Sequence, residues 1–255
     1  MTSDPDALIE VLRHTAESDS RIQGLVLCGS SAEPSRRDRW SDHDFLLITN
    51  DGTPEQFRTD LSWLPAAEDI AWSFRETAHG LKALYRSGLL IEFAVFDRAE
   101  FAGCVLNHAI VVVDRGGIAA ITETVRDRSL APRNVNRLSE FRLFLALVYI
   151  GTGRARRGER LSASVFVRTY AVEHLLRLAR DLVPREQAAE LDALDVFRRF
   201  ESADPRLAAA IDAAVTLDVV DVGRALLQAA EDWLASHWPE YPREDTALVR
   251  ALLDS

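Results

Sequence analysis

The feature that most constrains this chain is a pair of aspartates, Asp42 and Asp44, followed at once by the apolar run FLLIT at residues 45–49. A short run that is apolar on both faces is typical of a strand in the interior of a sheet. Side chains alternate along a strand, so both carboxylates point to one side and His43 points to the other. Like charges this close repel each other and resist burial. A divalent cation with oxygen ligands would hold them, although the pair alone also fits a solvated strand end or a turn cap.

A glycine and a serine end the apolar run that precedes this pair. Gly29 and Ser30 directly follow the strand-like segment Ile22–Cys28. Glycine lets a phosphate approach the backbone, and exposed N–H groups together with a serine hydroxyl bind its oxygens. The alternative is an ordinary turn with a helix cap. Next to two aspartates, this turn is a candidate phosphate site.

A third carboxylate lies within an apolar run, GLLIEFAVF. An ionised carboxylate such as Glu92 is costly among apolar side chains unless it is paired or bound to a metal. Strand alternation places it on the face of Leu90 and Ala94, so one face of this strand can carry a polar site. The alternatives are an edge strand with Glu92 turned to water, or an ion pair with an arginine. Three carboxylates from two strands beside a Gly-Ser turn favour a metal-dependent phosphate site.

The order of the expected elements indicates an α+β fold. Six strand-like runs alternate with turn signals in the first half, at Ile22–Cys28, Phe45–Thr49, Ile70–Glu76, Leu81–Arg86, Leu89–Phe96 and Ala109–Asp114. From Leu138 onward, apolar residues recur at helical spacing. We expect an N-terminal domain with a mixed β-sheet flanked by helices, residues 1–130, and a C-terminal all-α helical bundle, residues 131–255. The composition changes between residues 126 and 134.

Composition excludes several classes of protein. A formal net charge of −10 and a pI near 5.1 argue against a general affinity for nucleic-acid backbones. The longest apolar stretch is too short to span a bilayer, and the N-terminus has no apolar core of the signal-peptide kind. Two widely spaced cysteines, Cys28 and Cys104, fit free thiols in a reducing compartment. We therefore expect a soluble cytoplasmic protein.

Three stretches, CGS, WSDHDFLLIT and LLIEFAVFD, together resemble the nucleotidyltransferase superfamily of polymerase-β-like fold. Its signature is an apolar residue followed by Gly-Ser, then Asp-x-Asp or Asp-x-Glu, with a third carboxylate on a later strand. Within it, the chain is most similar to the two-domain antibiotic nucleotidyltransferases, above all the lincosamide branch and then the aminoglycoside adenylyltransferases. The resemblance covers residues 16–97 well and the helical half loosely. His43 is a departure, since the family usually has an apolar residue there, and it suggests more polar surroundings for the carboxylates.

The resemblance implies an adenylyltransferase-like enzyme of antibiotic resistance that moves a nucleoside monophosphate from ATP or GTP to a hydroxyl of a small molecule. Asp42 and Asp44 would hold one or two Mg²⁺ ions that bridge the triphosphate. Gly29 and Ser30 would cradle the terminal phosphates. Glu92 would complete the metal site or deprotonate the acceptor hydroxyl. The alternatives are transfer to a protein or an RNA, as in toxin–antitoxin relatives, and a nucleotide-binding regulator without catalysis.

Other side chains are candidates for accessory roles. Arg39 and Lys82 are candidate phosphate partners, with a solvated charge as the alternative for the arginine. Glu159 is a candidate acceptor-side carboxylate, with helix capping as the alternative. The first half also contains three tryptophans, Trp40, Trp63 and Trp72. Each could stack on a base or an acceptor ring, or be buried in the core. The resemblance also implies a homodimer and places acceptor binding in the helical domain.

Overall fold

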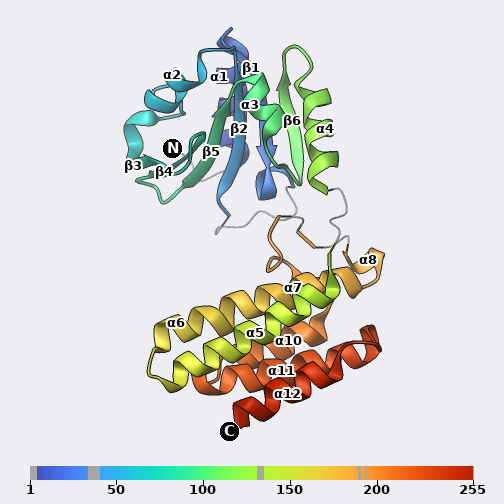
Figure 1. The fold of residues 1–255 in the computed structure, drawn as a ribbon. Coiled ribbons are helices and arrows are strands. Elements are labelled where there is room, and N and C mark those ends of the chain that lie inside the picture. The colour runs from blue at the N-terminus through green and yellow to red at the C-terminus, as the bar shows by residue number, and fades with distance from the viewer. Residues whose placement is uncertain (1–4, 34–40, 131–134, 189–190, 193, 255) are drawn as a thin grey trace. The chain divides into compact units, whose positions relative to one another are not determined.

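The computed structural model describes residues 5–33, 41–130, 135–188, 191–192 and 194–254 (Figure 1). The chain divides into two compact units, residues 1–131 and 132–255. The division falls within the segment 126–134, where the sequence changes from strand-rich to helix-rich. Each unit has its own apolar core.

The first unit is built on a mixed sheet with the strand order β3-β4-β5-β2-β1-β6. The strands are β1 (Ile22–Cys28), β2 (His43–Thr49), β3 (Ile70–Arg75), β4 (Gly80–Tyr85), β5 (Leu90–Phe96) and β6 (Ala109–Asp114). β2 and β5 pair in parallel, and the other neighbours pair antiparallel. All six expected strands are present, and β2 begins two residues earlier than expected because His43 pairs with Ile91.

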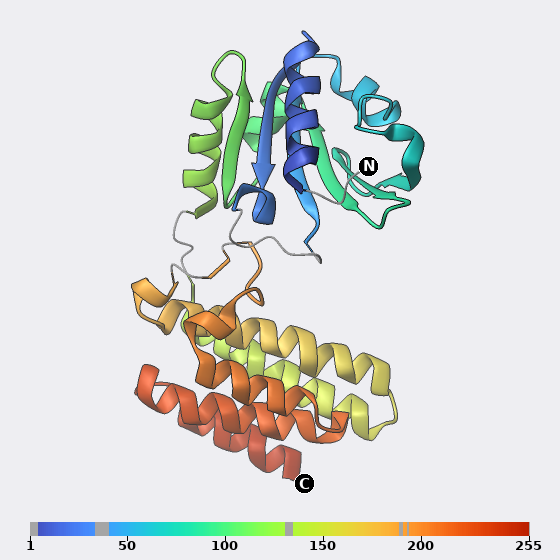
Figure 2. The same ribbon diagram turned by 180° about the vertical axis from the view of Figure 1, so that it is seen from behind.

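Helices cover both faces of this sheet. α1 (Pro5–Ser18) lies on one face, and α3 (Arg98–Gly103) and α4 (Ile118–Leu130) lie on the other, as a comparison of Figures 1 and 2 shows. The core on the α1 side also receives Phe57 from α2 (Pro54–Thr59). Phe45 stacks there on Phe93 of the neighbouring strand, with ring centroids 5.2 Å apart. This packing fixes β2 and β5, the two strands that carry the acidic residues.

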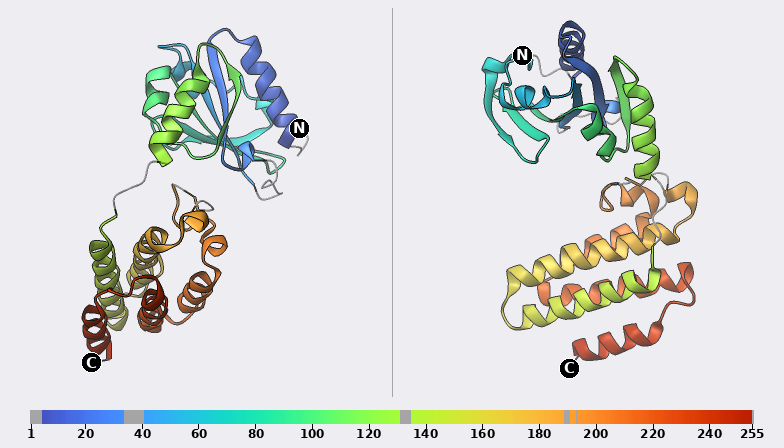
Figure 3. Two further views of the ribbon diagram at one scale, coloured as in Figure 1. Left: turned by 90° about the vertical axis from the view of Figure 1, so that its right-hand side faces the viewer. Right: turned by 45° about the horizontal axis from the view of Figure 1, so that its top comes forward.

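The second unit is all-helical (Figure 3). Its helices are α5 (Arg137–Arg156), α6 (Arg160–Val165), α7 (Ala171–Leu182), α8 (Arg185–Ala188), α9 (Phe200–Ala203), α10 (Pro205–Val215), α11 (Val219–His237) and α12 (Arg243–Asp254), with a π-helical segment Phe166–Tyr170 between α6 and α7. α11 approaches α5 closely, since a β-carbon on Gly223 would clash with the Thr152 hydroxyl oxygen. The fold class is thus confirmed. Within the described residues, no helix is both long and apolar enough to cross a membrane.

Candidate active site

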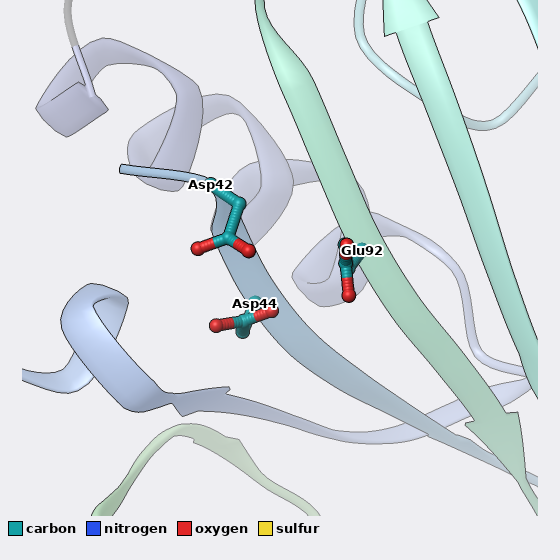
Figure 4. Close-up of side chains that lie close together, drawn as sticks. All are labelled: Asp42, Asp44 and Glu92. Carbon is teal, nitrogen blue, oxygen red and sulfur yellow. The ribbon is translucent and has the colours of Figure 1, made fainter. Parts of the chain in front are cut away.

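Three carboxylates converge at one end of the two parallel strands. Asp42 directly precedes β2, Asp44 lies within it, and Glu92 lies opposite Asp44 on β5. One oxygen from each of the three lies within 4.8 Å of the others, and Figure 4 shows the side chains around one shared space. All three residues are half-buried. The convergence inferred from the sequence is therefore present in the fold.

Helices α3 and α4 cover a part of this sheet face that does not include the carboxylates. α3 and α4 pack over Val26, Ile48 and Phe96. Asp44 and Glu92 lie further along the same strands on the same face, beyond the apolar cluster. The carboxylates are therefore reachable by solutes, although apolar packing surrounds the strands that hold them.

The turn after β1 is connected to the start of β2 by hydrogen bonds. Gly29 begins a short 3-10 helix, Gly29–Ala32, with a left-handed φ of 55°. The Ser31 hydroxyl oxygen accepts a hydrogen bond from the Asp44 backbone N–H at 3.1 Å. The Ser30 hydroxyl donates to the Asp42 carbonyl at 3.2 Å. Both serines are buried, so they fix the backbone that carries the aspartates. Ser30 was expected at the site from the sequence, whereas Ser31 was missed, and the doubled serine in GSS is its only signal.

Lys82 on β4 pairs with Glu92. Its ammonium lies 2.9 Å from a carboxylate oxygen of Glu92 and 3.3 Å from one of Glu76. The hydrogen bond to Glu92 raises the pKa of Lys82 above its usual value, and Glu76 adds to the effect. The partner of Glu92 is thus a lysine on the adjacent strand, where the sequence analysis considered an arginine.

The three carboxylates fit a magnesium ion. Mg²⁺ prefers oxygen ligands at about 2.1 Å, so two of its ligands lie at most about 4.2 Å apart. Oxygens within 4.8 Å of one another reach that spacing with small side-chain movements. The donor set, three carboxylates with no nitrogen or sulfur, suits a hard cation rather than zinc or copper.

One family model matches this region. Residues 3–71 match the model described as streptomycin adenylyltransferase. The matched segment contains the turn at Gly29 together with Asp42 and Asp44, and it ends before Lys82 and Glu92. This match supports the nucleotidyltransferase superfamily. The match also supports an enzyme of the adenylyltransferase-like kind.

Solved structures resemble this chain at low identity. The nucleotidyltransferase-like protein of Exiguobacterium sibiricum is 15% identical with a TM-score of 0.35, over 90% of this chain and 78% of that one. The aminoglycoside 6-adenyltransferase of Bacillus subtilis is 13% identical with a TM-score of 0.30, over 99% of both chains. A CD-NTase of Bradyrhizobium diazoefficiens is 12% identical with a TM-score of 0.29, over 99% of this chain and 93% of that one. No curated protein sequence matches the chain. Likeness at this level carries no argument about function.

Three further candidates of the sequence are Arg39, Trp40 and Glu159. Arg39 and Trp40 lie outside the described residues. Glu159 belongs to the helical unit, at the start of α6, where it makes an ion pair with Arg157 at 2.9 Å and no capping hydrogen bond from its side chain. Its acceptor-side role stays a prediction.

Two of the three tryptophans of the first half are described, and they differ in environment. Trp63 packs edge-on against Phe45 and Phe93 in the core. Trp72 on β3 is 47% exposed and lies beside Phe74, which is 48% exposed. The core role thus holds for Trp63, whereas the Trp72 side chain is accessible. Phe74 was missed by the sequence analysis, and its only signal is the alternation in WSF.

His43 lies on the opposite face of β2 from the carboxylates. It is 6% exposed and pairs in register with Ile91, whose side chain belongs to the core on the α1 side. Alternation along the strand therefore separates the His43 ring from the acidic site. The ring does not supply the more polar surroundings that the sequence analysis suggested for the carboxylates.

Proposed function

We propose that this nucleotidyltransferase moves a nucleoside monophosphate, in the first place AMP, from a nucleoside triphosphate to a hydroxyl of a small molecule in a Mg²⁺-dependent reaction. The proposal rests on the convergence of Asp42, Asp44 and Glu92, whose carboxylate oxygens, one from each residue, lie within 4.8 Å of one another. Three carboxylates at this spacing on an open sheet face are suited to a cation-assisted reaction of a polyanionic substrate.

Each residue has a defined task in this proposal. Asp42 and Asp44 would hold Mg²⁺, which when bound neutralises the charge that develops on the triphosphate. The acceptor oxygen forms a bond to the α-phosphorus, the bond from that phosphorus to the bridging oxygen breaks, and pyrophosphate leaves. The acceptor proton passes to Glu92 if that carboxylate is the base, and otherwise to solvent. The turn at Gly29 would lie against the terminal phosphates, because it is next to the Asp44 carboxylate that would hold the metal.

The acceptor that we propose is an antibiotic of the lincosamide or aminoglycoside type. The match of residues 3–71 to the streptomycin adenylyltransferase model supports the aminoglycoside type. We also propose that the protein is a homodimer whose helical unit binds the acceptor or mediates dimerisation. Ser30, Arg39 and Lys82 would contact the phosphates. The protein would act in the cytoplasm, which supplies ATP and Mg²⁺. Sedimentation equilibrium of the purified chain tests the dimer directly.

The decisive experiment is a transfer assay. The protein is incubated with Mg²⁺, with ATP or GTP, and with streptomycin, kanamycin or lincomycin, and the drugs are analysed by mass spectrometry. We expect one drug to gain the mass of one nucleoside monophosphate. If no drug is modified while a protein or an RNA becomes labelled from radioactive ATP, the acceptor class is wrong.

An aspartate variant separates catalysis from folding. Asp44→Asn is expected to lose at least 100-fold in turnover and to lose the rise in melting temperature that Mg²⁺ with a non-hydrolysable ATP analogue produces. The matched control is Asp51→Asn, in the exposed turn after β2, which should keep both. Full turnover in Asp44→Asn would refute the metal assignment.

A further inference from the structure

An exposed aromatic pair lies on the same sheet face as the acidic site. The register aligns one row of side chains across four strands: Asp44 on β2, Glu92 on β5, Lys82 on β4 and Phe74 on β3. Residues directly opposite one another in a sheet project to the same face, so Phe74 belongs to the face of the carboxylates. Trp72 is two residues away on the same strand and therefore shares that face.

The aromatic pair is accessible and continuous with the site. Trp72 and Phe74 are 47% and 48% exposed, and their ring centroids lie 5.9 Å apart. β3 and β4 lie beyond β5 at one edge of the sheet (Figure 1). In the strand register, the half-buried residues Lys82, Leu84 and Leu90 stand between the rings and the carboxylates. Large apolar side chains that remain exposed beside a polar site are typical of a ligand-binding surface.

We propose that Trp72 and Phe74 form a platform that binds the acceptor of the transfer reaction, and that this acceptor is a cationic molecule with more than one ring. This inference rests on the proposed function. The order of the strands indicates whether the acceptor or the nucleotide binds to this platform. The Gly29 turn lies on the β1 side of Asp44, whereas the platform lies on the opposite side, beyond Glu92. Attacking and leaving oxygens are in line in phosphoryl transfer, so a leaving pyrophosphate at the Gly29 turn requires the acceptor to enter from the side of β5, β4 and β3.

Charge and distance define the class of acceptor. Glu76, which contacts Lys82, places a further carboxylate next to the platform. Aromatic faces and carboxylates together attract a cation. Two strand spacings separate Glu92 from Phe74, which is about 10 Å. An acceptor whose hydroxyl reaches Glu92 while a ring stacks on the platform is therefore at least that long, as in a molecule of two or three linked rings.

The test is a fluorescence titration with streptomycin, kanamycin and lincomycin as probes. The chain has five tryptophans, so the difference between wild type and Trp72→Phe isolates the emission of Trp72. We expect at least one probe to change this emission. We further expect Phe74→Ala and Trp72→Ala to weaken binding of that probe about tenfold, whereas Trp72→Phe keeps most of it. The matched control is Ile110→Ala, a 48% exposed residue on the opposite edge strand β6, which should leave binding unchanged.

The outcomes separate this inference from the proposed function. If no probe changes the emission of Trp72 in a protein that still binds Mg²⁺ with ATP, the platform is wrong and the proposed function stands. The platform is also wrong if Phe74→Ala changes the sedimentation mass, because the rings then contact a second copy of the chain through the β3 edge. If Mg²⁺-dependent ATP binding is itself absent, the proposed function fails, whatever the probes do.

Discussion

Asp44 occupies the space that a side chain at position 29 would need. A β-carbon built on Gly29 would lie 2.7 Å from the Oδ2 atom of Asp44, which is closer than real Cβ contacts allow. The backbone of Gly29 is also left-handed, with a φ of 55°. Both the left-handed backbone and the lack of space for a β-carbon favour glycine at this position. The position of the Asp44 carboxylate depends on the missing β-carbon.

Gly29→Ala is expected to disable the site more than it destabilises the fold. The left-handed backbone costs a non-glycine residue about 1–2 kcal/mol. The new methyl group also displaces the Asp44 carboxylate, and a displacement of about 1 Å costs on the order of 100-fold in rate. The measurement is kcat/KM for the transfer reaction together with the rise in melting temperature on addition of Mg²⁺.

Gly52→Ala is the matched control for this variant. Gly52 has a φ of 75°, and a β-carbon there would meet no atom within 4 Å. The Gly52→Ala variant should therefore lose a similar amount of stability and keep its transfer activity. Equal activity of the two variants would show that Gly29 does not set the position of Asp44.

Ser31→Ala tests the hydrogen bond that fixes the start of β2. Ser31 is 2% exposed, and its hydroxyl oxygen accepts a hydrogen bond from the Asp44 backbone N–H. Loss of a buried hydrogen-bond partner costs about 1–3 kcal/mol. We expect urea unfolding to show a loss of that size, and kcat to fall because Asp44 is less well held. The control is Ser87→Ala, in the exposed hairpin turn, whose free energy of unfolding should stay within about 0.5 kcal/mol of wild type. An equal loss of stability in both variants would show that the Ser31 hydrogen bond does not stabilise the start of β2.

Phe45→Ala tests how far the core supports the site. Phe45 is 1% exposed and stacks on Phe93, its partner in register. Removal of a buried aromatic ring costs about 3–5 kcal/mol, which should appear in the midpoint and extrapolated free energy of urea unfolding. Phe74→Ala removes the same side chain from a 48% exposed position and should change stability by about 0.5 kcal/mol or less. If both variants are equally stable, the packing of β2 on β5 does not hold the sheet as inferred.

Local patterns were enough to predict the strands of the sheet. Alternation and turn residues are properties of neighbouring residues, which is why β1 and β6 match their expected bounds. The convergence of Asp44 with Glu92 was predicted from the cost of an isolated carboxylate in an apolar strand. Both inferences rest on chemistry that a single sequence displays.

The register between distant strands could not be predicted in the same way. The row from Asp44 to Phe74 depends on β5 lying between β2 and β4, and strand order is set by packing over the whole sheet. The choice of Lys82 as the partner of Glu92 follows from that order. Ser31 was missed for a similar reason, because its contact with Asp44 joins two segments that only the fold brings together.

Lys82 offers a direct test of the site's electrostatics, because it is the only lysine of the chain. Selective labelling of lysine therefore gives a single signal whose titration reports one pKa. The hydrogen bond to Glu92 raises this pKa above its usual value of 10.5, with a smaller effect of Glu76. We expect Glu92→Gln to lower the pKa of Lys82 clearly and Glu76→Gln to lower it less.

The same pair makes a pH-dependent contribution to stability, and its sign is fixed. A cation whose pKa is higher in the folded than in the unfolded state stabilises the fold fully below the unfolded pKa. The contribution disappears as the pH rises through the folded pKa, because both states then hold a neutral amine. The difference in free energy of unfolding between wild type and Glu92→Gln should therefore be constant from pH 7 to 9 and shrink above about pH 10.5. A difference that grows with alkaline pH would show that Lys82 does not pair with Glu92 in solution.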